Sequence, residues 1–168
     1  ALNLYKKAKT MDSILIKGID CHIGSQITDL KPFEDSVKKL IALIDKLEIE
    51  GINIEHIDIG GGIGISYEDE KAIPFDDYAK AVITLTKGRD LKILLEPGRV
   101  IMADAGAILT KVEYVKKTQD KNFAIIDAAM NDLMRPSLYG AFHKIVNTSE
   151  TTDKESVFDI VGPICETG

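Results

Sequence analysis

The chain has 168 residues, of which 45% are hydrophobic and 29% charged, and its formal net charge is -6 at pH 7. This composition is typical of a globular protein. The negative charge argues against a nucleic-acid-binding surface, and no apolar run approaches the roughly 20 residues that span a bilayer. Two cysteines imply no disulfide framework and favour the reducing cytoplasm.

Strand and helix patterns alternate through the first hundred residues. Asp29 and Pro32 suit the first turn of a helix, and Gly51 and Gly88 suit helix ends. In order, the sequence predicts the end of a helix over 2–11, a strand over 14–22, a helix over 33–47, a strand over 52–59, a helix over 75–85 and a strand over 92–95. This order predicts a parallel α/β arrangement with right-handed crossovers.

Each of these strands ends in polar or glycine-rich residues. The three ends are His22-Ile23-Gly24-Ser25, Gly60-Gly61-Gly62 and Glu96-Pro97-Gly98-Arg99. Ligands bind at the carboxyl ends of parallel strands. We therefore expect these three segments to meet at one edge of the sheet and to form a site.

The three glycines are the clearest of these signals. Glycine adopts positive φ readily and lets the backbone come close to a ligand, and a run of amide N–H groups at a strand end can hold an anion. Three glycines are also typical of a flexible turn. The flanking motifs favour the anion site.

The remaining strand-end residues each allow two interpretations. His22 is either a half-buried loop histidine or a ring stacked on a flat ligand, and Ser25 could give its hydroxyl to a phosphate. Glu96 follows three apolar residues, so it is either a surface glutamate or a carboxylate paired with a cationic ring nitrogen. We interpret Asp58 and His56 as structural, as we do Asp127.

Arginine is rare in this chain, because only Arg89, Arg99 and Arg135 are found among 21 basic residues. A solvated surface charge is the ordinary interpretation of an arginine. Scarcity favours a planar, bidentate contact with a carboxylate or phosphate instead. Arg135 lies in a loop-like stretch, four residues before Tyr139, and Arg99 could face the same pocket as Glu96.

The pattern changes near residues 100–107, where we place a domain boundary. Residues 108–115 alternate like a half-exposed antiparallel strand, and further strands are expected over 123–127 and 157–161. A loop is expected over 147–155. Cys165 and Glu166 follow a Gly-Pro turn, so the thiol is either packed or presented to a pocket, which could belong to another subunit.

Five segments together resemble the fold-type III pyridoxal-phosphate (PLP) decarboxylases, in particular their diaminopimelate branch. They are His22-Ile23-Gly24-Ser25-Gln26, Asp58-Ile59-Gly60-Gly61-Gly62, Glu96-Pro97-Gly98-Arg99, Met134-Arg135-Pro136-Ser137-Leu138-Tyr139 and Gly162-Pro163-Ile164-Cys165-Glu166. The resemblance implies an α/β fold in which residues 1–105 form later strand–helix units of an alanine racemase-like (β/α)8 barrel. Residues 106–168 would begin a C-terminal β-domain.

The resemblance also implies roles for these residues. PLP would be held by His22 stacked on its ring, by Ser25 and Gly60–Gly62 at its phosphate, and by Glu96 at its pyridinium nitrogen, with Pro97, Gly98 and Arg99 alongside. Arg99, Arg135 and Tyr139 would bind the substrate, Glu166 its distal ammonium, and Cys165 would donate a proton across the interface of a cytoplasmic homodimer. The implied reaction is decarboxylation of meso-2,6-diaminopimelate to L-lysine, with no metal.

The chain departs from the family pattern in one important respect. None of its lysines lies in a motif matching the family's Schiff-base lysine. The chain also opens at Ala1 and ends just after Glu166, so we expect a fragment that is inactive alone. The alternatives are an ornithine- or arginine-type decarboxylase, a non-catalytic PLP-binding protein, and an unrelated phosphate-binding α/β domain.

Overall fold

The computed structural model describes residues 1–149 and 156–165. It divides the chain into two compact units, Ala1–Gly106 and Ala107–Gly168, and each unit is described by itself. Within the described ranges, no helix combines the length and the apolar character that a membrane crossing needs.

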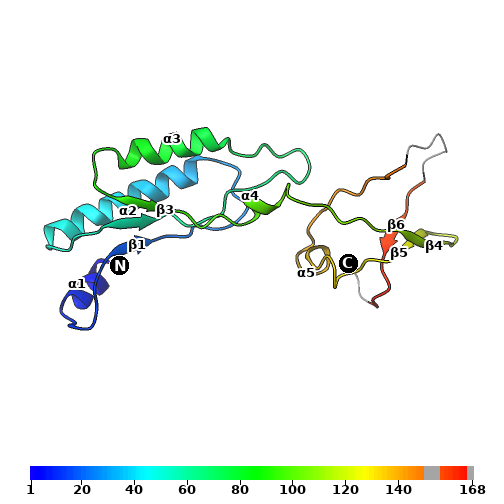
Figure 1. The fold of residues 1–168 in the computed structure, drawn as a ribbon, viewed down its shortest axis with the longest axis horizontal. Coiled ribbons are helices and arrows are strands. Elements are labelled where there is room, and N and C mark those ends of the chain that lie inside the picture. Colours follow the sequence, from blue (N-terminus) through cyan, green and yellow to red (C-terminus); the bar gives the residue numbers. More distant parts are fainter. Residues whose placement is uncertain (150–155, 166–168) are drawn as a thin grey trace. The chain divides into compact units, whose positions relative to one another are not determined.

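The first unit alternates helices with short parallel strands (Figure 1), as its sequence predicted. The strands pair in the order β1-β2-β3, with Asp20, Asp58 and Leu94 in register at their carboxyl ends. In chain order the elements are α1 Leu2–Lys9, β1 Gly18–Asp20, α2 Lys31–Ile49, β2 His56–Asp58, α3 Phe75–Thr86, β3 Lys92–Leu94 and α4 Arg99–Met102.

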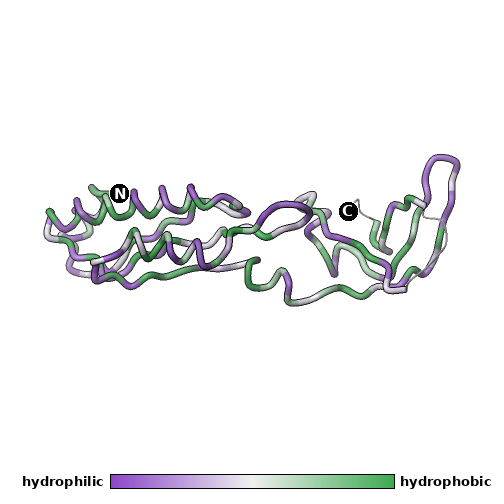
Figure 2. Tube along the Cα trace, turned by 90° about the horizontal axis from the view of Figure 1, so that it is seen from above, coloured by the Kyte–Doolittle hydropathy of each residue, from purple (hydrophilic) through white to green (hydrophobic). Residues whose placement is uncertain are grey.

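The hydrophobic core of this unit lies between the sheet and the helices α2 and α3. The buried residues of α2 recur at helical spacing, so one stripe of the helix faces the strands; they include Phe33, Val37, Leu40, Ile44 and Leu47. Ile57 of β2 is fully buried against them. The helices accordingly alternate between hydrophobic and hydrophilic residues along their length (Figure 2). Each buried aliphatic side chain contributes about 1.5–3 kcal/mol.

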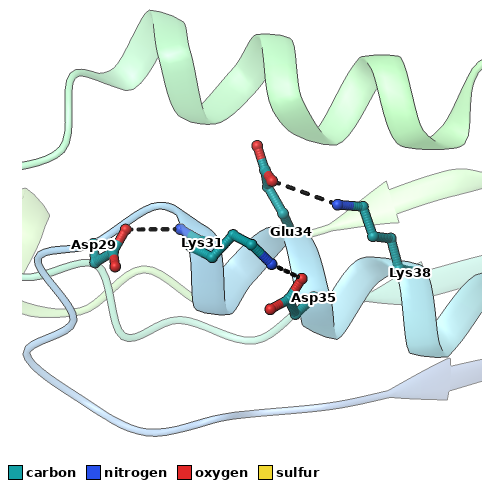
Figure 3. Close-up of polar contacts among 5 residues, drawn as sticks. All are labelled: Asp29, Lys31, Glu34, Asp35 and Lys38. Atoms are coloured by element: carbon teal, nitrogen blue, oxygen red, sulfur yellow. Dashed lines mark hydrogen bonds and ion pairs between the residues drawn. The ribbon is translucent and has the colours of Figure 1, made fainter.

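The start of α2 is fixed by local polar contacts (Figure 3). The Asp29 carboxylate accepts a hydrogen bond from the Lys31 amide N–H at 2.9 Å, and Pro32 occupies the first turn. Lys31 pairs with Asp35, and Lys38 with Glu34, one turn apart on the exposed face. Exposed pairs of this kind contribute little to stability, because water and salt screen their charges. The hydrogen bond to Asp29 thus fixes the place where the loop after β1 ends and α2 begins.

The strands are shorter than the sequence predicted. The predicted strand over 14–22 contains only β1, and the one over 52–59 contains only β2. Ile52 and Ile54 are buried without belonging to the parallel ladder. The alternation of Ile52 and Ile54 with polar residues therefore indicates burial of their side chains in the core. It does not indicate backbone pairing, which is limited to three residues in each strand.

Two further side chains in the first unit are structural. The ring of His56 fills the space beside its strand neighbour Gly18, where a Cβ atom would collide with it. Tyr78 packs edge-on against Phe33, with 5.1 Å between the ring centroids. Burial, and to a smaller extent the charge of Asp58, raises the pKa of Tyr78 to about 12. The packing of the His56 ring against Gly18 supports its structural interpretation.

The second unit is a small sheet with strand order β4-β5-β6. Strand β4 (Val112–Lys117) pairs antiparallel with β5 (Asn122–Ile126), with a register shift between Val112 and Tyr114, and β5 pairs parallel with β6 (Asp159–Val161). Asp127 accepts hydrogen bonds from the Thr110 hydroxyl and the Lys111 amide. These bonds lower the pKa of Asp127, which supports its structural interpretation.

Three predictions for this unit need correction. The strand predicted over 108–115 begins at Val112, and all of β4 is exposed rather than half-exposed. The strand predicted over 157–161 begins at Asp159. The stretch before Tyr139, predicted as a loop, contains α5 (Arg135–Tyr139), which ends at Gly140 with φ of 58°. The loop predicted over 147–155 lies partly outside the described residues.

Candidate functional site

The carboxyl ends of the three parallel strands meet at one edge of the first unit. The Gly61 amide N–H, after β2, donates a hydrogen bond to Nδ1 of His22, after β1, at 3.2 Å. The Glu96 amide N–H, after β3, donates to the Gly60 carbonyl at 2.9 Å. The prediction that these segments meet at one edge is therefore confirmed.

The three glycines are required because the neighbouring strand ends approach them closely. Gly60 and Gly62 have φ of 70° and 96°, which side chains of L-residues rarely allow. A Cβ atom on Gly61 would collide with the Glu96 carbonyl oxygen, and one on Gly62 with the Gly24 carbonyl oxygen. Because Gly61 and Gly62 have no side chains, the backbones of the neighbouring strand ends can pack against them.

The backbone amides of this turn divide into two groups. Those of Gly60, Gly61 and Gly64 donate to Asp58 Oδ1, His22 Nδ1 and the Ile27 carbonyl respectively. Those of Gly62 and Ile63 donate to no protein acceptor within the described part of the chain. Two successive N–H groups on a turn with positive φ are suited to an anion.

His22 and Ser25 lie on the loop that faces this turn. The Nδ1 atom of the His22 ring accepts a hydrogen bond from the Gly61 amide, which fixes the orientation of the ring. The ring is exposed, so it offers a flat surface in a fixed orientation. Ser25 is exposed and follows Gly24, whose carbonyl oxygen lies against Gly62.

Glu96 belongs to a cluster of three carboxylates. Oxygens of Asp20, Asp58 and Glu96 all lie within 4.8 Å of one another. Like charges at this separation repel each other, so the edge favours a cationic partner. The Glu96 side chain is exposed.

Arg99 contacts a protein side chain that the sequence did not point to. Its Nη1 donates a hydrogen bond to the Tyr67 hydroxyl at 2.9 Å. Tyr67 lies on the loop that follows the three glycines, so Arg99 links this loop to α4. Pro97 and Gly98 are exposed, and Gly98 precedes the first residue of α4.

The remaining predicted residues belong to the second unit. Arg135 and Tyr139 lie one turn apart on α5, with the guanidinium carbon 5.2 Å from the centroid of the Tyr139 ring. Cys165 is an exposed free thiol beyond β6. Glu166 lies outside the described residues. Of these residues, Arg135 and Tyr139 are brought together, with the guanidinium over the ring.

Four residues at the edge were not selected from the sequence: Asp20, Gln26 and Tyr67, and also Asp58, which was interpreted as structural but belongs to the carboxylate cluster. A carboxylate oxygen of Asp20 lies within 4.8 Å of one of Glu96. Tyr67 accepts a hydrogen bond from Arg99, and Gln26 bridges two loops. Asp20 could have been found from strand alternation, because it follows the buried Ile19 and precedes His22. Tyr67 carries no such signal.

The groups at this edge fit pyridoxal phosphate. The amides of Gly62 and Ile63 and the hydroxyl of Ser25 are donors for a phosphate. The carboxylate cluster around Glu96 is suited to a protonated pyridine nitrogen, and the His22 ring to the flat face of the cofactor. Anion donors and carboxylates thus both occur at this edge.

Comparisons with known proteins give a consistent result. A family model described as "Pyridoxal-dependent decarboxylase, pyridoxal binding domain" matches residues 1–103. Diaminopimelate decarboxylase of Vibrio cholerae is 50% identical over 168 residues, which cover 99% of this chain and 40% of that protein.

Two solved structures are similar over almost the whole chain. AQ1208 of Aquifex aeolicus has a TM-score of 0.94 at 44% identity, covering 98% of this chain and 41% of that one. Diaminopimelate decarboxylase of Helicobacter pylori complexed with L-lysine has a TM-score of 0.88 at 42% identity, covering 99% and 41%. The chain thus spans about two fifths of the length of these relatives.

Proposed function

Because the chain belongs to the pyridoxal-dependent decarboxylases, through their pyridoxal-binding domain, we propose that the whole protein converts meso-2,6-diaminopimelate to L-lysine and CO₂. This is the last step of lysine biosynthesis. The observation that carries the proposal is the meeting of His22, the glycine turn and Glu96 at one strand edge. Relatives named diaminopimelate decarboxylase cover the chain end to end.

The residues of the edge bind and orient the cofactor. The Gly62 and Ile63 amides and Ser25 would hold its phosphate, and the His22 ring would stack on its pyridine ring. Glu96, with Asp20 and Asp58 beside it, keeps the pyridine nitrogen protonated. When bound, PLP takes up the electron pair of the carbon–carboxylate bond that breaks.

The second group of residues binds the substrate. Arg99, Arg135 and Tyr139 bind a carboxylate of diaminopimelate, which orients the bond to be broken. Cys165 donates the proton that replaces CO₂, and Glu166 binds the distal ammonium. The lysine that carries PLP lies elsewhere in the whole protein.

The same proposal extends to domain organisation and assembly. Residues 1–105 are part of the PLP-binding (β/α)8 barrel, and residues 106–168 are part of a C-terminal β-domain. The protein acts in the cytoplasm as a homodimer whose subunits share the active site. The exposed Cys165 thiol is consistent with a role across such an interface.

The proposal is tested by the substrate specificity of the whole protein. Loaded with PLP, it should release CO₂ from meso-diaminopimelate and form an equal amount of L-lysine. With L-ornithine or L-arginine, kcat/KM should be at least about 100-fold lower, because a site that binds a distal carboxylate is left unpaired by these substrates. Equal or faster release of CO₂ from either would indicate the other decarboxylase type. Binding of PLP without CO₂ from any of them would indicate a non-catalytic protein.

A further inference from the structure

Gln26 occupies an unusual backbone position beside the glycine turn. Its φ is 59°, and it is the one non-glycine residue with positive φ in the described ranges. Residues other than glycine adopt this conformation only where the surrounding structure enforces it, and such positions concentrate at functional sites. The contacts of Gln26 therefore have to enforce its positive φ.

The side chain of Gln26 bridges to the loop that follows β2. Its Nε2 donates to the Ile65 carbonyl at 2.6 Å, and its Oε1 accepts from the Ile65 amide at 3.4 Å. The side-chain amide thus pairs with the backbone of Ile65 as a neighbouring strand would. The bridge joins segments 39 residues apart and is half-buried.

Backbone bonds continue this pairing towards the glycines. The Ile27 amide donates to the Gly62 carbonyl at 2.9 Å, and the Gly64 amide donates to the Ile27 carbonyl at 2.8 Å. The two amides without a protein acceptor, those of Gly62 and Ile63, lie within this paired segment. The Gln26 bridge closes it on the side of Ile65.

We propose that Gln26 is a positioning residue for phosphate binding, because its bridge to Ile65 holds the Ser25 loop against the Gly62–Ile63 amides. In this backbone conformation, Gln26 connects Ser25, the residue before it, to the side-chain bridge with Ile65. Gln26 itself contacts no ligand in this account. The inference rests on the proposed function, since the phosphate is that of PLP.

The test compares two cofactor forms on the whole apoprotein. Gln26→Gly removes the bridge but suits the positive φ, so the variant is expected to fold. Its Kd for PLP should rise about tenfold or more, from the loss of two hydrogen bonds that fix the site. Its Kd for pyridoxal, which lacks the phosphate, should change less than about threefold. Both constants are measured by titration of cofactor absorbance.

Two further variants sharpen the result. Gln26→Glu keeps the shape but turns a carboxylate oxygen towards the Ile65 carbonyl, so it should weaken PLP as Gln26→Gly does. Gln119→Gly, in the exposed turn between β4 and β5, should leave both constants unchanged.

An equal loss for PLP and pyridoxal in Gln26→Gly would indicate a general structural role and overturn the proposal. Wild-type-like binding by both Gln26 variants would overturn it while leaving the proposed function intact. A wild-type protein that binds no PLP would contradict the proposed function as well.

Discussion

Replacing Gly62 by alanine in the whole protein is expected to abolish measurable PLP binding and to destabilise the fold by about 2–5 kcal/mol. Two effects add, because alanine is strained at φ of 96°, at ~1–2 kcal/mol, and its Cβ collides with the Gly24 carbonyl oxygen, at ~1–3 kcal/mol. The atom that the new Cβ would meet belongs to the backbone and not to a flexible side chain, so it cannot simply rotate away. Relief requires the two loops to separate, which moves the amides of Gly62 and Ile63 away from Ser25.

Two other glycines separate these effects. Gly88 has φ of 80° and open space at its Cβ position, so Gly88→Ala should cost only the ~1–2 kcal/mol of strain and leave PLP binding unchanged. Gly106 has open space without positive φ, so Gly106→Ala should be neutral. Urea unfolding and PLP titration of the three variants provide the comparison. A Gly62→Ala protein with wild-type affinity for PLP would exclude the turn from the site.

Replacing Arg135 by alanine is expected to lower kcat/KM for diaminopimelate by at least about 100-fold, or ~2.7 kcal/mol of transition-state stabilisation. The guanidinium is held over the Tyr139 ring on α5, so it is already oriented to bind a carboxylate through two N–H groups. Arg135→Lys should recover little activity, because an ammonium is a point charge without that fork geometry. Steady-state kinetics of the whole protein, with PLP affinity measured in parallel, test this expectation.

Arg89 is the matched control among the few arginines of this chain. It binds Asp45 at 2.5 Å and Glu48 at 3.9 Å, both on α2, and so serves the fold. Arg89→Ala should therefore leave kcat/KM unchanged. If Arg135→Ala and Arg89→Ala behave alike, Arg135 has no role in substrate binding.

Much of the first unit could be predicted because its signals are local. The helices α2 and α3 follow from apolar spacing and from Pro32, Gly51 and Gly88, and their parallel order follows from the alternation with strands. The family and the fold class that the five motifs indicated are confirmed. Strand lengths could not be predicted, because Ile52 and Ile54 are buried without pairing.

The second unit was less predictable for a different reason. Helix α5 has only five residues, too few for helical periodicity to show, and Pro136 resembles a loop residue in sequence. The exposure of all of β4 is likewise invisible in its alternating pattern, since alternation indicates a face to be covered without identifying what covers it.

At the site, strand ends were predictable and partners were not. The meeting of His22 with Gly61 follows from parallel topology, because carboxyl ends share one edge. Arg99 binds Tyr67, which is 32 residues away, and Gln26 binds Ile65 across 39 residues. Neither contact follows from local pattern, because the Arg99 contact depends on how a loop packs on α4, and the Gln26 contact on how two loops lie beside each other.

A crystal structure of the whole protein loaded with PLP tests most directly whether the phosphate of PLP binds at the edge formed by the three strand ends. Phosphate oxygens are expected about 2.7–3.2 Å from the Gly62 and Ile63 amides and the Ser25 hydroxyl, with the pyridine nitrogen facing Glu96. A phosphate bound away from these amides, with the glycine turn unchanged, would contradict this expectation.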